Sequence, residues 1–461
     1  MKSLPILMLV LIAFQSTRAE VALTIDVDSP EAYAFEGWGT SLCWWAHRVG
    51  GWRDESLGPL LDAITDPVDG LGLSVFRYNI GGGEAPDHNH FRRYADLPGF
   101  QAGPDAPLDP NADERQRRVL EMLVSRVPDA VLEAFSNSPP YWMTRSGCAA
   151  GGVLGQPNLA DDRVDDFAAY LTNVLAAYRD RHGLVFRSLD PFNEPNQPWW
   201  NTSGNQEGCH VPEGQQSAVL LAVSQALAER GLDKTTTLAA TDAHSIDLAL
   251  HNAQRLTPAA LATVGQINTH TYRGSQRREL SDFAATEGKR LWQSESGPMG
   301  LRKRGGGVLL AMMRRVALDL NELRPTAWVM WQVVDVSSQW SCFHLDDPTE
   351  TFRPNSNYGL YSQFTRRIRP GDRIVPTADA AVVAAVSSND QRLMVVVVND
   401  DDAPRPCRVG VRGATPVIGT AEGSSSSVDE ARTVVAVEQD ESLRFTAPPE
   451  SVTSVVVELD R

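Results

Sequence analysis

Two glutamates stand in sequence contexts that suit proton chemistry. Residues 189–195 read Leu-Asp-Pro-Phe-Asn-Glu-Pro, so Glu194 follows an apolar segment that is typical of a β-strand. Residues 291–297 read Leu-Trp-Gln-Ser-Glu-Ser-Gly and give Glu295 the same setting. If both segments are parallel strands of one sheet, both carboxylates lie at its carboxyl edge. Two carboxylates that face each other there could divide the work of an acid and a nucleophile.

Either glutamate alone would more often be a solvated surface group, so the elements that position them matter. Apolar segments with strand character alternate with amphipathic helical segments along most of the chain. Eight such segments are predicted as strands: residues 34–40, 73–79, 130–136, 185–192, 236–241, 264–270, 289–295 and 326–332. Glu194 and Glu295 follow or end the fourth and the seventh of them.

Helical periodicity is clearest in residues 161–182, whose apolar side chains fall on one face and which Gly183 can end. Residues 113–126, 213–230 and 306–323 show the same pattern. Alternating strands and helices imply parallel strands with right-handed crossovers. Eight repeats predict a closed barrel. A doubly wound sheet is the alternative, but it would favour an early Gly-x-Gly-x-x-Gly phosphate loop, which this chain lacks.

The pattern changes after residue 370, where β-branched runs alternate with short polar turns such as residues 399–402 and 424–427. We therefore predict an α/β fold: a (β/α)8 TIM barrel over residues 34–370 with an attached small β-sandwich over residues 371–461. The strand-like residues 20–33 are expected to join the β-sandwich.

The first nineteen residues resemble a signal peptide, with Lys2, an apolar stretch and a small-residue cleavage site at Ala19. The apolar stretch is too short to span a bilayer comfortably, so we expect a secreted or periplasmic protein with no membrane partner after cleavage. The formal net charge is −16, from 42 basic and 58 acidic residues, which argues against a nucleic-acid partner. A monomer is the expected state.

The five cysteines fit no zinc pattern. An exported protein can form disulfides, and Cys148 and Cys209 are the best candidates because both fall in loops predicted on the same face. The alternative is that all five are small buried thiols. His88 and His90 resemble a metal motif, but without a matching carboxylate pattern we interpret them as loop contacts and predict no metal.

The loops that follow the strands are rich in aromatic and amide side chains. Tryptophan offers a flat apolar face that suits the C–H faces of sugars, and amides and imidazoles bond hydroxyls directionally. Any single tryptophan could equally belong to the barrel core. The predicted substrate-binding residues are Asn193, Trp38, Trp45, Arg77, Asn137, Trp142, Trp199, His270, Tyr272 and Trp331.

Several motifs carry a resemblance to a known family. They are Phe-Asn-Glu-Pro at 192–195, Thr-His-Thr-Tyr at 269–272, Ser-Glu-Ser at 294–296, Phe-Glu-Gly-Trp-Gly at 35–39, Phe-Arg-Tyr-Asn-Ile-Gly at 76–81 and Ser-Asn-Ser-Pro-Pro-Tyr-Trp-Met at 136–143. The chain resembles the retaining (β/α)8 glycosidases of glycoside hydrolase family 30, in clan A. The segments at 40–46 and 199–200 are most similar to its endo-β-1,6-galactanase branch.

This resemblance implies Glu194 as acid/base, Glu295 as nucleophile, Asn193 as partner of the substrate's 2-hydroxyl, and Tyr272 and Arg77 as neighbours of the nucleophile. It implies an oligo- or polysaccharide substrate and no cofactor. The two carboxyls should lie roughly 5–5.5 Å apart, and the acid should have a raised pKa.

Three other functions stay open. The first is another activity of the same family: β-1,6-glucanase, xylanase, exo-β-1,6-galactobiohydrolase or glucosylceramidase. The second is a non-catalytic carbohydrate-binding protein, against which the presence of both glutamates argues. A metal-dependent barrel hydrolase is the third, but no His-x-His follows the first predicted strand.

Overall fold

Eight parallel strands close into a barrel, which confirms the predicted fold class. The computed structural model describes residues 20–301, 307–337, 339–430 and 432–461, so the predicted signal peptide lies outside the described residues. Around the barrel the strands are β3 (Gly37–Ser41), β4 (Val75–Asn79), β5 (Val131–Phe135), β6 (Ser188–Asp190), β7 (Thr237–Ser245), β8 (Val264–Arg273), β9 (Arg290–Ser296) and β10 (Ala327–Met330). Their carboxyl ends meet at one mouth.

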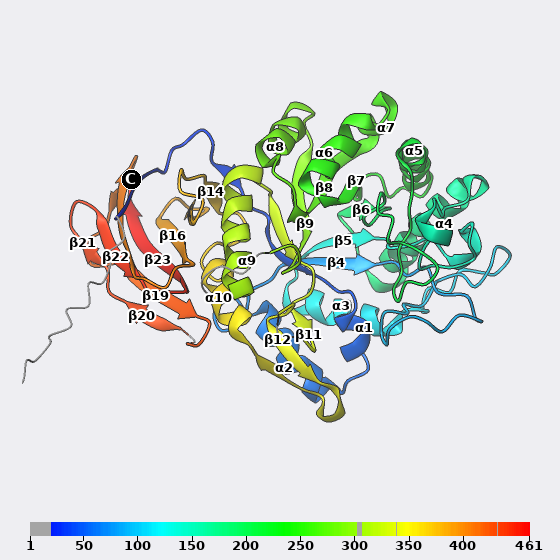
Figure 1. Ribbon diagram of the computed structural model, residues 1–461, viewed down its shortest axis with the longest axis horizontal. Helices are drawn as coiled ribbons and strands as arrows, with labels where there is room; N and C mark the ends of the chain where they lie inside the picture. The colour runs from blue at the N-terminus through cyan, green and yellow to red at the C-terminus, as the bar shows by residue number, and fades with distance from the viewer. Residues whose placement is uncertain (1–19, 302–306, 338, 431) are drawn as a thin grey trace, which may run out of the picture.

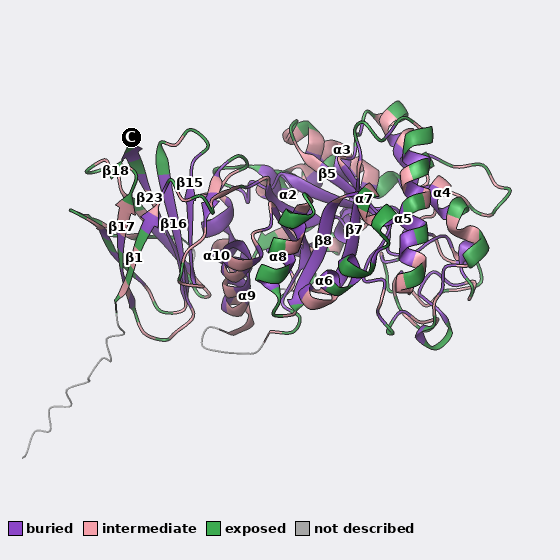
Figure 2. Ribbon diagram, turned by 90° about the horizontal axis from the view of Figure 1, so that it is seen from above, coloured by how far each residue is buried: buried purple, intermediate pink, exposed green. Residues whose placement is uncertain are grey.

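Helices cover the barrel, and its strands are buried on both faces. Figure 1 shows the helical layer, and Figure 2 shows the buried strands inside it. The helices are α1 (Trp45–Val49), α2 (Asp54–Thr65), α3 (Glu114–Arg126), α4 (Val164–His182), α5 (Glu213–Glu229), α6 (Ile246–Arg255), α7 (Pro258–Thr263), α8 (Arg277–Thr286), α9 (Gly307–Leu318) and α10 (Ser356–Thr365). Gly183 ends α4 with a left-handed φ of 66°, as its position in the sequence predicts.

Two further sheets stack against each other beside the barrel (Figure 1). One contains β1 (Val21–Asp26), β17 (Arg405–Arg412), β22 (Leu443–Ala447) and β21 (Glu438–Gln439). The other contains β2 (Tyr33–Ala34), β14 (Arg373–Val375), β15 (Val382–Val386), β16 (Arg392–Asn399), β23 (Ser451–Asp460), β19 (Glu422–Ser427) and β20 (Thr433–Val435), with β18 (Thr415–Pro416) beside β23. Strand β1 pairs in parallel with β17, so the start of the described chain lies within this β-structure.

Helices α9 and α10 lie between these sheets and the barrel in both views (Figures 1 and 2). A polar contact joins α10 to the larger sheet, where the Gln363 amide bonds the hydroxyls of Ser424, Ser426 and Ser454 at 2.7–2.9 Å. The prediction of a turn at residues 424–427 is therefore wrong. Residues 424–427 belong to β19 and Ser454 belongs to β23, and the hydroxyls of Ser424, Ser426 and Ser454 satisfy the buried Gln363 amide.

The predicted Cys148–Cys209 disulfide is also wrong, since all five cysteines are free and buried. The Sγ of Cys148 contacts Glu84 and His90 instead, at 3.6 Å and 3.7 Å. Cys209 Sγ faces the carbonyl oxygen of His210. Both thiols do lie in loops at the barrel mouth, but their side chains point to different neighbours.

A small sheet forms in the loop after β10 and borders the mouth. It contains β11 (Val334–Asp335), β12 (Phe343–Asp346) and β13 (Thr351–Pro354). Trp340 lies between the first two of these strands and reaches the ring of Tyr272 with a centroid distance of 6.4 Å. The loop therefore adds an aromatic wall to the side of the mouth that β8 and β9 line.

Candidate active site

Glu194 and Glu295 meet at the barrel mouth. Glu194 lies in the loop after β6, and Glu295 lies near the end of β9. Both are nearly buried. The Nδ1 atom of His270 lies 3.1 Å from the Oε1 of Glu194 and 3.5 Å from the Oε1 of Glu295. The two oxygens therefore cannot be farther apart than the sum of these distances, about 6.6 Å.

The backbone that presents Glu194 is held in an unusual conformation. Glu194 and Asp242 both have a φ of 48°, in the left-handed region that residues with a Cβ seldom adopt. The amide of Glu194 donates a hydrogen bond of 2.8 Å to the carbonyl of Asp242, so each strained residue supports the other. Such conformations cost about 1–3 kcal/mol each and gather at functional sites.

Two histidines hold the Glu194 carboxylate. His244 Nδ1 lies 2.7 Å from its Oε1, and His270 Nδ1 reaches the same oxygen. A carboxylate oxygen accepts, so the imidazole N–H groups donate. Burial alone would raise the pKa of Glu194, but these hydrogen bonds outweigh burial and lower the pKa to about 2.

Glu295 has one oxygen held and one oxygen free. The hydroxyl of Tyr272 donates to Oε1 at 2.9 Å, and the guanidinium of Arg77 lies 3.6 Å from Oε2. Among the described residues, Oε2 has no hydrogen-bond partner although it is buried. Burial raises the pKa of Glu295 to about 7, in spite of the opposing charge of His270.

These directions reverse the expectation from sequence, which gave Glu194 the raised pKa and kept Glu295 ionised. The cause is the second histidine: nothing in the sequence indicated that His244 and His270 would both donate to Glu194. Because the two glutamates also repel each other, they titrate as a pair. Between about pH 2 and about pH 7 this pair carries one proton.

Arg77 lies beneath the pair in a fully buried polar layer that crosses the barrel. Its guanidinium bonds Glu133 at 2.9 Å, Asp242 at 2.8 Å and the carbonyl of Ser294 at 2.9 Å. Burial disfavours its charge, but Asp242 and Glu133 outweigh that effect and raise the pKa of Arg77. A permanent cation is thus fixed under the nucleophile candidate, and Asp242 is fixed under His270 at 3.3 Å.

A cavity of about 960 Å³ opens above the two glutamates. Its polar floor includes Asn193, whose Oδ1 is buried and has no partner among the described residues. Aromatic rings form the walls: Trp44, Trp45, Tyr94, Trp199, Trp200, Tyr272, Trp331 and Trp340. Trp199 is 44% exposed at the rim, and its ring lies 5.0 Å from that of His244. Flat apolar walls over polar groups suit a sugar chain.

The structure places the sequence-predicted residues in three groups. Asn193, Trp45, Trp199, Tyr272 and Trp331 line the cavity with both glutamates. His270 and Arg77 lie directly under it and contact the carboxylates. Trp38, Asn137 and Trp142 are not among the described residues that line the cavity, so their prediction as substrate-binding residues is corrected.

The reasons for these three corrections differ. Trp38 packs between the barrel and α10, against the ring of Tyr361 and beside Trp328, and its indole N–H donates to the carbonyl of Ile368. Asn137 is buried with its amide directed at Cys43. The indole N–H of Trp142 donates to the carbonyl of Gln101 at 3.0 Å.

Sequence reasoning missed His244 and Asp242, which contact Glu194 and Arg77. Strand β7 runs to Ser245, beyond the predicted end at residue 241, so both belong to the strand rather than to a loop. The polar run Thr-Asp-Ala-His after an apolar segment was the available signal. This run resembles a loop because strand ends at a barrel mouth carry polar side chains, as loops do.

Comparison with known proteins decides the class of enzyme. Residues 20–268, more than half of the chain, match the family model described as O-Glycosyl hydrolase family 30. The chain belongs to O-glycosyl hydrolase family 30. This confirms the predicted family and makes the protein an O-glycosyl hydrolase.

Two relatives are named as a galactanase and a galactobiohydrolase. An endo-beta-1,6-galactanase of Hypocrea rufa is 31% identical over 399 residues, which cover 82% of this chain and 80% of the relative. An exo-beta-1,6-galactobiohydrolase of Bifidobacterium longum subsp. longum is 27% identical, and the match covers 68% of this chain but 27% of that longer protein. The catalytic domain of a family 30 xylanase C from Talaromyces cellulolyticus shares the fold, with a TM-score of 0.73, 15% identity, and coverage of 95% and 99% of the two chains.

Proposed function

We propose that this protein is a retaining glycosidase that cleaves β-1,6-linked galactan, with Glu194 as acid/base and Glu295 as nucleophile. The single observation that carries the proposal is the contact of both carboxylates with one atom, His270 Nδ1. Retaining glycosidases have carboxyls roughly 5–5.5 Å apart, and inverting ones roughly 6.5–9.5 Å. The upper limit of about 6.6 Å derived above reaches only the lower edge of the inverting range.

In the first step, Oε2 of Glu295 attacks the anomeric carbon. This oxygen has no hydrogen-bond partner among the described residues, while Tyr272 keeps the carboxylate oriented through Oε1. Glu194 gives its proton to the leaving glycosidic oxygen. The positive charge that develops on the sugar favours an ionised Glu295, and so it moves the shared proton of the pair to Glu194.

In the second step, Glu194 takes a proton from a water molecule that attacks the glycosyl ester. His244 and His270 stabilise the carboxylate form of Glu194, which is the form this step requires. Arg77 stabilises Glu295 as it leaves. The low pKa of Glu194 in the free enzyme therefore favours deglycosylation. For glycosylation, substrate binding must first move the shared proton to Glu194.

The choice of galactan is supported by the endo-acting relative, whose match extends over most of both chains. The exo-acting relative keeps galactobiose release as the second candidate. The rim residue Trp199 stays exposed rather than closing the cavity, which favours internal cleavage. The remaining alternatives are β-1,6-glucanase, xylanase and glucosylceramidase activities.

Digestion of defined oligosaccharides tests the substrate. We expect β-1,6-galactotetraose and longer chains to be cleaved to a mixture of short products, with kcat/KM at least tenfold above that for β-1,6-glucan, β-1,4-xylan or glucosylceramide, because a site that bonds hydroxyls rejects a misplaced one strongly. Products are measured by anion-exchange chromatography over time. Galactobiose as sole product would favour exo action, and preference for another polymer would contradict the galactan proposal.

The pH profile tests the electrostatics of the pair. Above about pH 7 the pair loses its remaining proton, so no acid is left to protonate the leaving oxygen. We expect kcat/KM to fall roughly tenfold per pH unit above that point. The control is Glu207→Gln: burial raises the pKa of Glu207 to about 8, but it is not among the described residues that line the cavity. A profile that stays level to pH 9, or one that Glu207→Gln moves, would contradict this account.

We also propose that the protein acts outside the cytoplasm, as a monomer. The signal-like residues 1–19 and a polymeric substrate support export. Within the described residues, no helix is both long enough and apolar enough to cross a membrane.

A further inference from the structure

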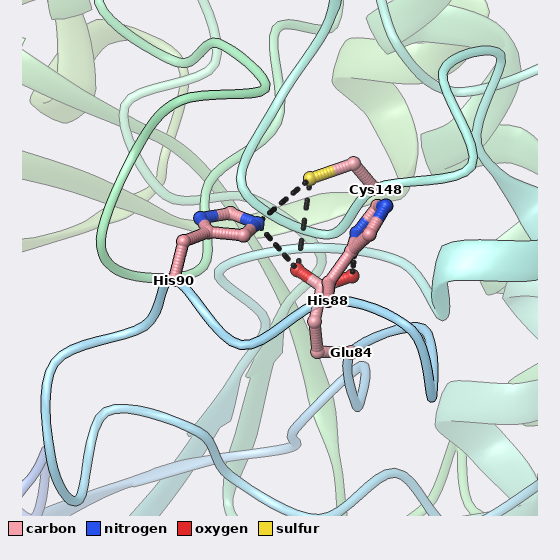
Figure 3. A group of neighbouring side chains, drawn as sticks. All are labelled: Glu84, His88, His90 and Cys148. Atoms are coloured by element: carbon pink, nitrogen blue, oxygen red, sulfur yellow. Dashed lines mark hydrogen bonds and ion pairs between the residues drawn. The ribbon is translucent and has the colours of Figure 1, made fainter.

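A second group of reactive side chains lies behind the cavity wall, next to Gly204 and apart from the glutamate pair. It contains Glu84, His88 and His90 from the loop after β4, and Cys148 from the loop after β5 (Figure 3). The four possible ligand atoms lie within 4.8 Å of one another. Cys148 is buried and Glu84 nearly so, and the two histidines are partly exposed. Nothing in the proposed hydrolysis uses these residues.

Three of the ligand atoms form a nearly equilateral triangle. Cys148 Sγ lies 3.6 Å from Glu84 Oε2 and 3.7 Å from His90 Nε2, and His90 Nε2 lies 3.7 Å from Glu84 Oε2 (Figure 3). Zinc binds nitrogen and oxygen at about 2.0–2.2 Å and sulfur at about 2.3 Å, so the edges of its tetrahedron measure roughly 3.3–3.8 Å. The three distances match one face of such a tetrahedron. The distance between His90 Nε2 and Glu84 Oε2 is too long for a hydrogen bond, whereas the two distances to sulfur are within reach of a thiol hydrogen bond when no metal is bound.

His90 is oriented as a metal ligand. Its Nδ1 bonds the carbonyl oxygen of Gly204. A carbonyl can only accept, so Nδ1 carries the proton and the lone pair of neutral His90 sits on Nε2. That nitrogen is the one that faces Cys148 and Glu84. A backbone carbonyl that fixes the tautomer of a metal-binding histidine in this way is a usual outer-shell partner.

The fourth side chain, His88, contacts the same carboxylate from its other side. Its Nδ1 lies 3.0 Å from Glu84 Oε1 (Figure 3), and one of its ring nitrogens lies within 4.8 Å of the other possible ligand atoms. If the binding nitrogen is Nδ1, His88 must give up this hydrogen bond to coordinate the ion. A thiolate with two imidazoles and a carboxylate suits Zn²⁺, whereas Ca²⁺ and Mg²⁺ prefer oxygen ligands alone. The sequence interpretation of His88 and His90 as loop contacts lacked a carboxylate and a thiol, and the fold supplies both.

We propose that Glu84, His88, His90 and Cys148 bind one zinc ion, which fastens three loops of the cavity wall together. The ligands join the loops after β4 and β5, and the His90–Gly204 bond adds the loop after β6. Gly204 lines the cavity, as do Arg92 and Asn205, whose backbones are bonded at 2.9 Å. The zinc ion has a structural role here, since the cluster is separate from Glu194 and Glu295.

Zinc binding by the purified full chain tests this directly. The protein is stripped with a chelator, dialysed and titrated with zinc chloride against a chromogenic competitor. We expect one tight site per chain. Loss of an outer-shell partner already weakens metal binding by about 10- to 100-fold, so Cys148→Ser should weaken it by about 100-fold or more. His90→Gln should do the same, and it provides a second variant should Cys148→Ser fold poorly.

Cobalt identifies the ligands. Co²⁺ in place of zinc should give a thiolate-to-cobalt charge-transfer band in the wild type that Cys148→Ser removes. Cys209→Ser is the matched control, because Cys209 is also a buried thiol at the barrel mouth but lies outside the cluster. It should keep both the affinity and the band. Equal zinc affinity in the wild type and Cys148→Ser would overturn the proposal, because the metal would then lie elsewhere, such as at Glu194, His244 and His270. Hydrolysis is not the readout, so the outcome is independent of the proposed substrate.

Discussion

Replacing Glu295 with glutamine is expected to lower kcat by about 10⁴-fold or more, because an amide cannot form the glycosyl ester. The fold should survive. The amide oxygen can still accept from Tyr272, and Arg77 keeps Glu133, Asp242 and the carbonyl of Ser294 as partners. Steady-state rates, thermal unfolding and binding of an oligosaccharide to the inactive variant measure these effects separately.

Glu207→Gln is the matched control for this experiment. Glu207 is a buried glutamate too, and it accepts hydrogen bonds from Asn79 and the amide of Gly82 at 2.8 Å. A glutamine here keeps one of these two hydrogen bonds and loses the other, because its NH2 group cannot accept, so thermal unfolding of this variant is measured beside its rate. Its kcat should stay within a few-fold of wild type. A Glu295→Gln enzyme with a comparable rate would refute the nucleophile assignment.

Replacing Glu194 with glutamine should slow cleavage of natural glycosides by about 10²- to 10⁴-fold, the usual contribution of a general acid. The loss should depend on the leaving group. A dinitrophenyl glycoside needs no proton, so its first step should stay fast while the second step, which lacks a base, becomes limiting. Stopped-flow release of dinitrophenol should then show a burst.

Azide provides the check on this role. It attacks the glycosyl ester without a base, so it should restore turnover in Glu194→Gln and have no effect on Glu295→Gln. If the Glu194 variant loses equal activity on good and poor leaving groups, with no burst and no azide effect, then Glu194 acts by another route.

The barrel could be predicted from sequence because its signal repeats. Segments with strand character alternate with helices that have one apolar face, and errors at single boundaries do not change the count. The serines of β19 are typical of a turn, so this strand was not predicted. They are buried because their hydroxyls bond the amide of Gln363, which lies about sixty residues away in the sequence. No local pattern carries such a contact.

Residues of the site could be predicted from sequence where a residue at the carboxyl end of a strand also lies at the barrel mouth. That argument holds for Glu194, Glu295 and Tyr272. It fails for Trp38, which lies on a strand but points into the core, because the direction of a side chain at a barrel mouth depends on register that sequence does not show. It also could not give the pKa directions, which depend on His244 as a second donor to Glu194.

In the proposed mechanism the sugar forms a covalent bond with the carboxylate of Glu295. The most direct measurement is mass spectrometry of peptides from Glu194→Gln after reaction with a dinitrophenyl glycoside of the sugar that the substrate panel identifies. The account predicts that the peptide containing Glu295 gains the mass of one glycosyl unit, and that azide removes it. An unmodified peptide during the burst, or an adduct on any other residue, would contradict it.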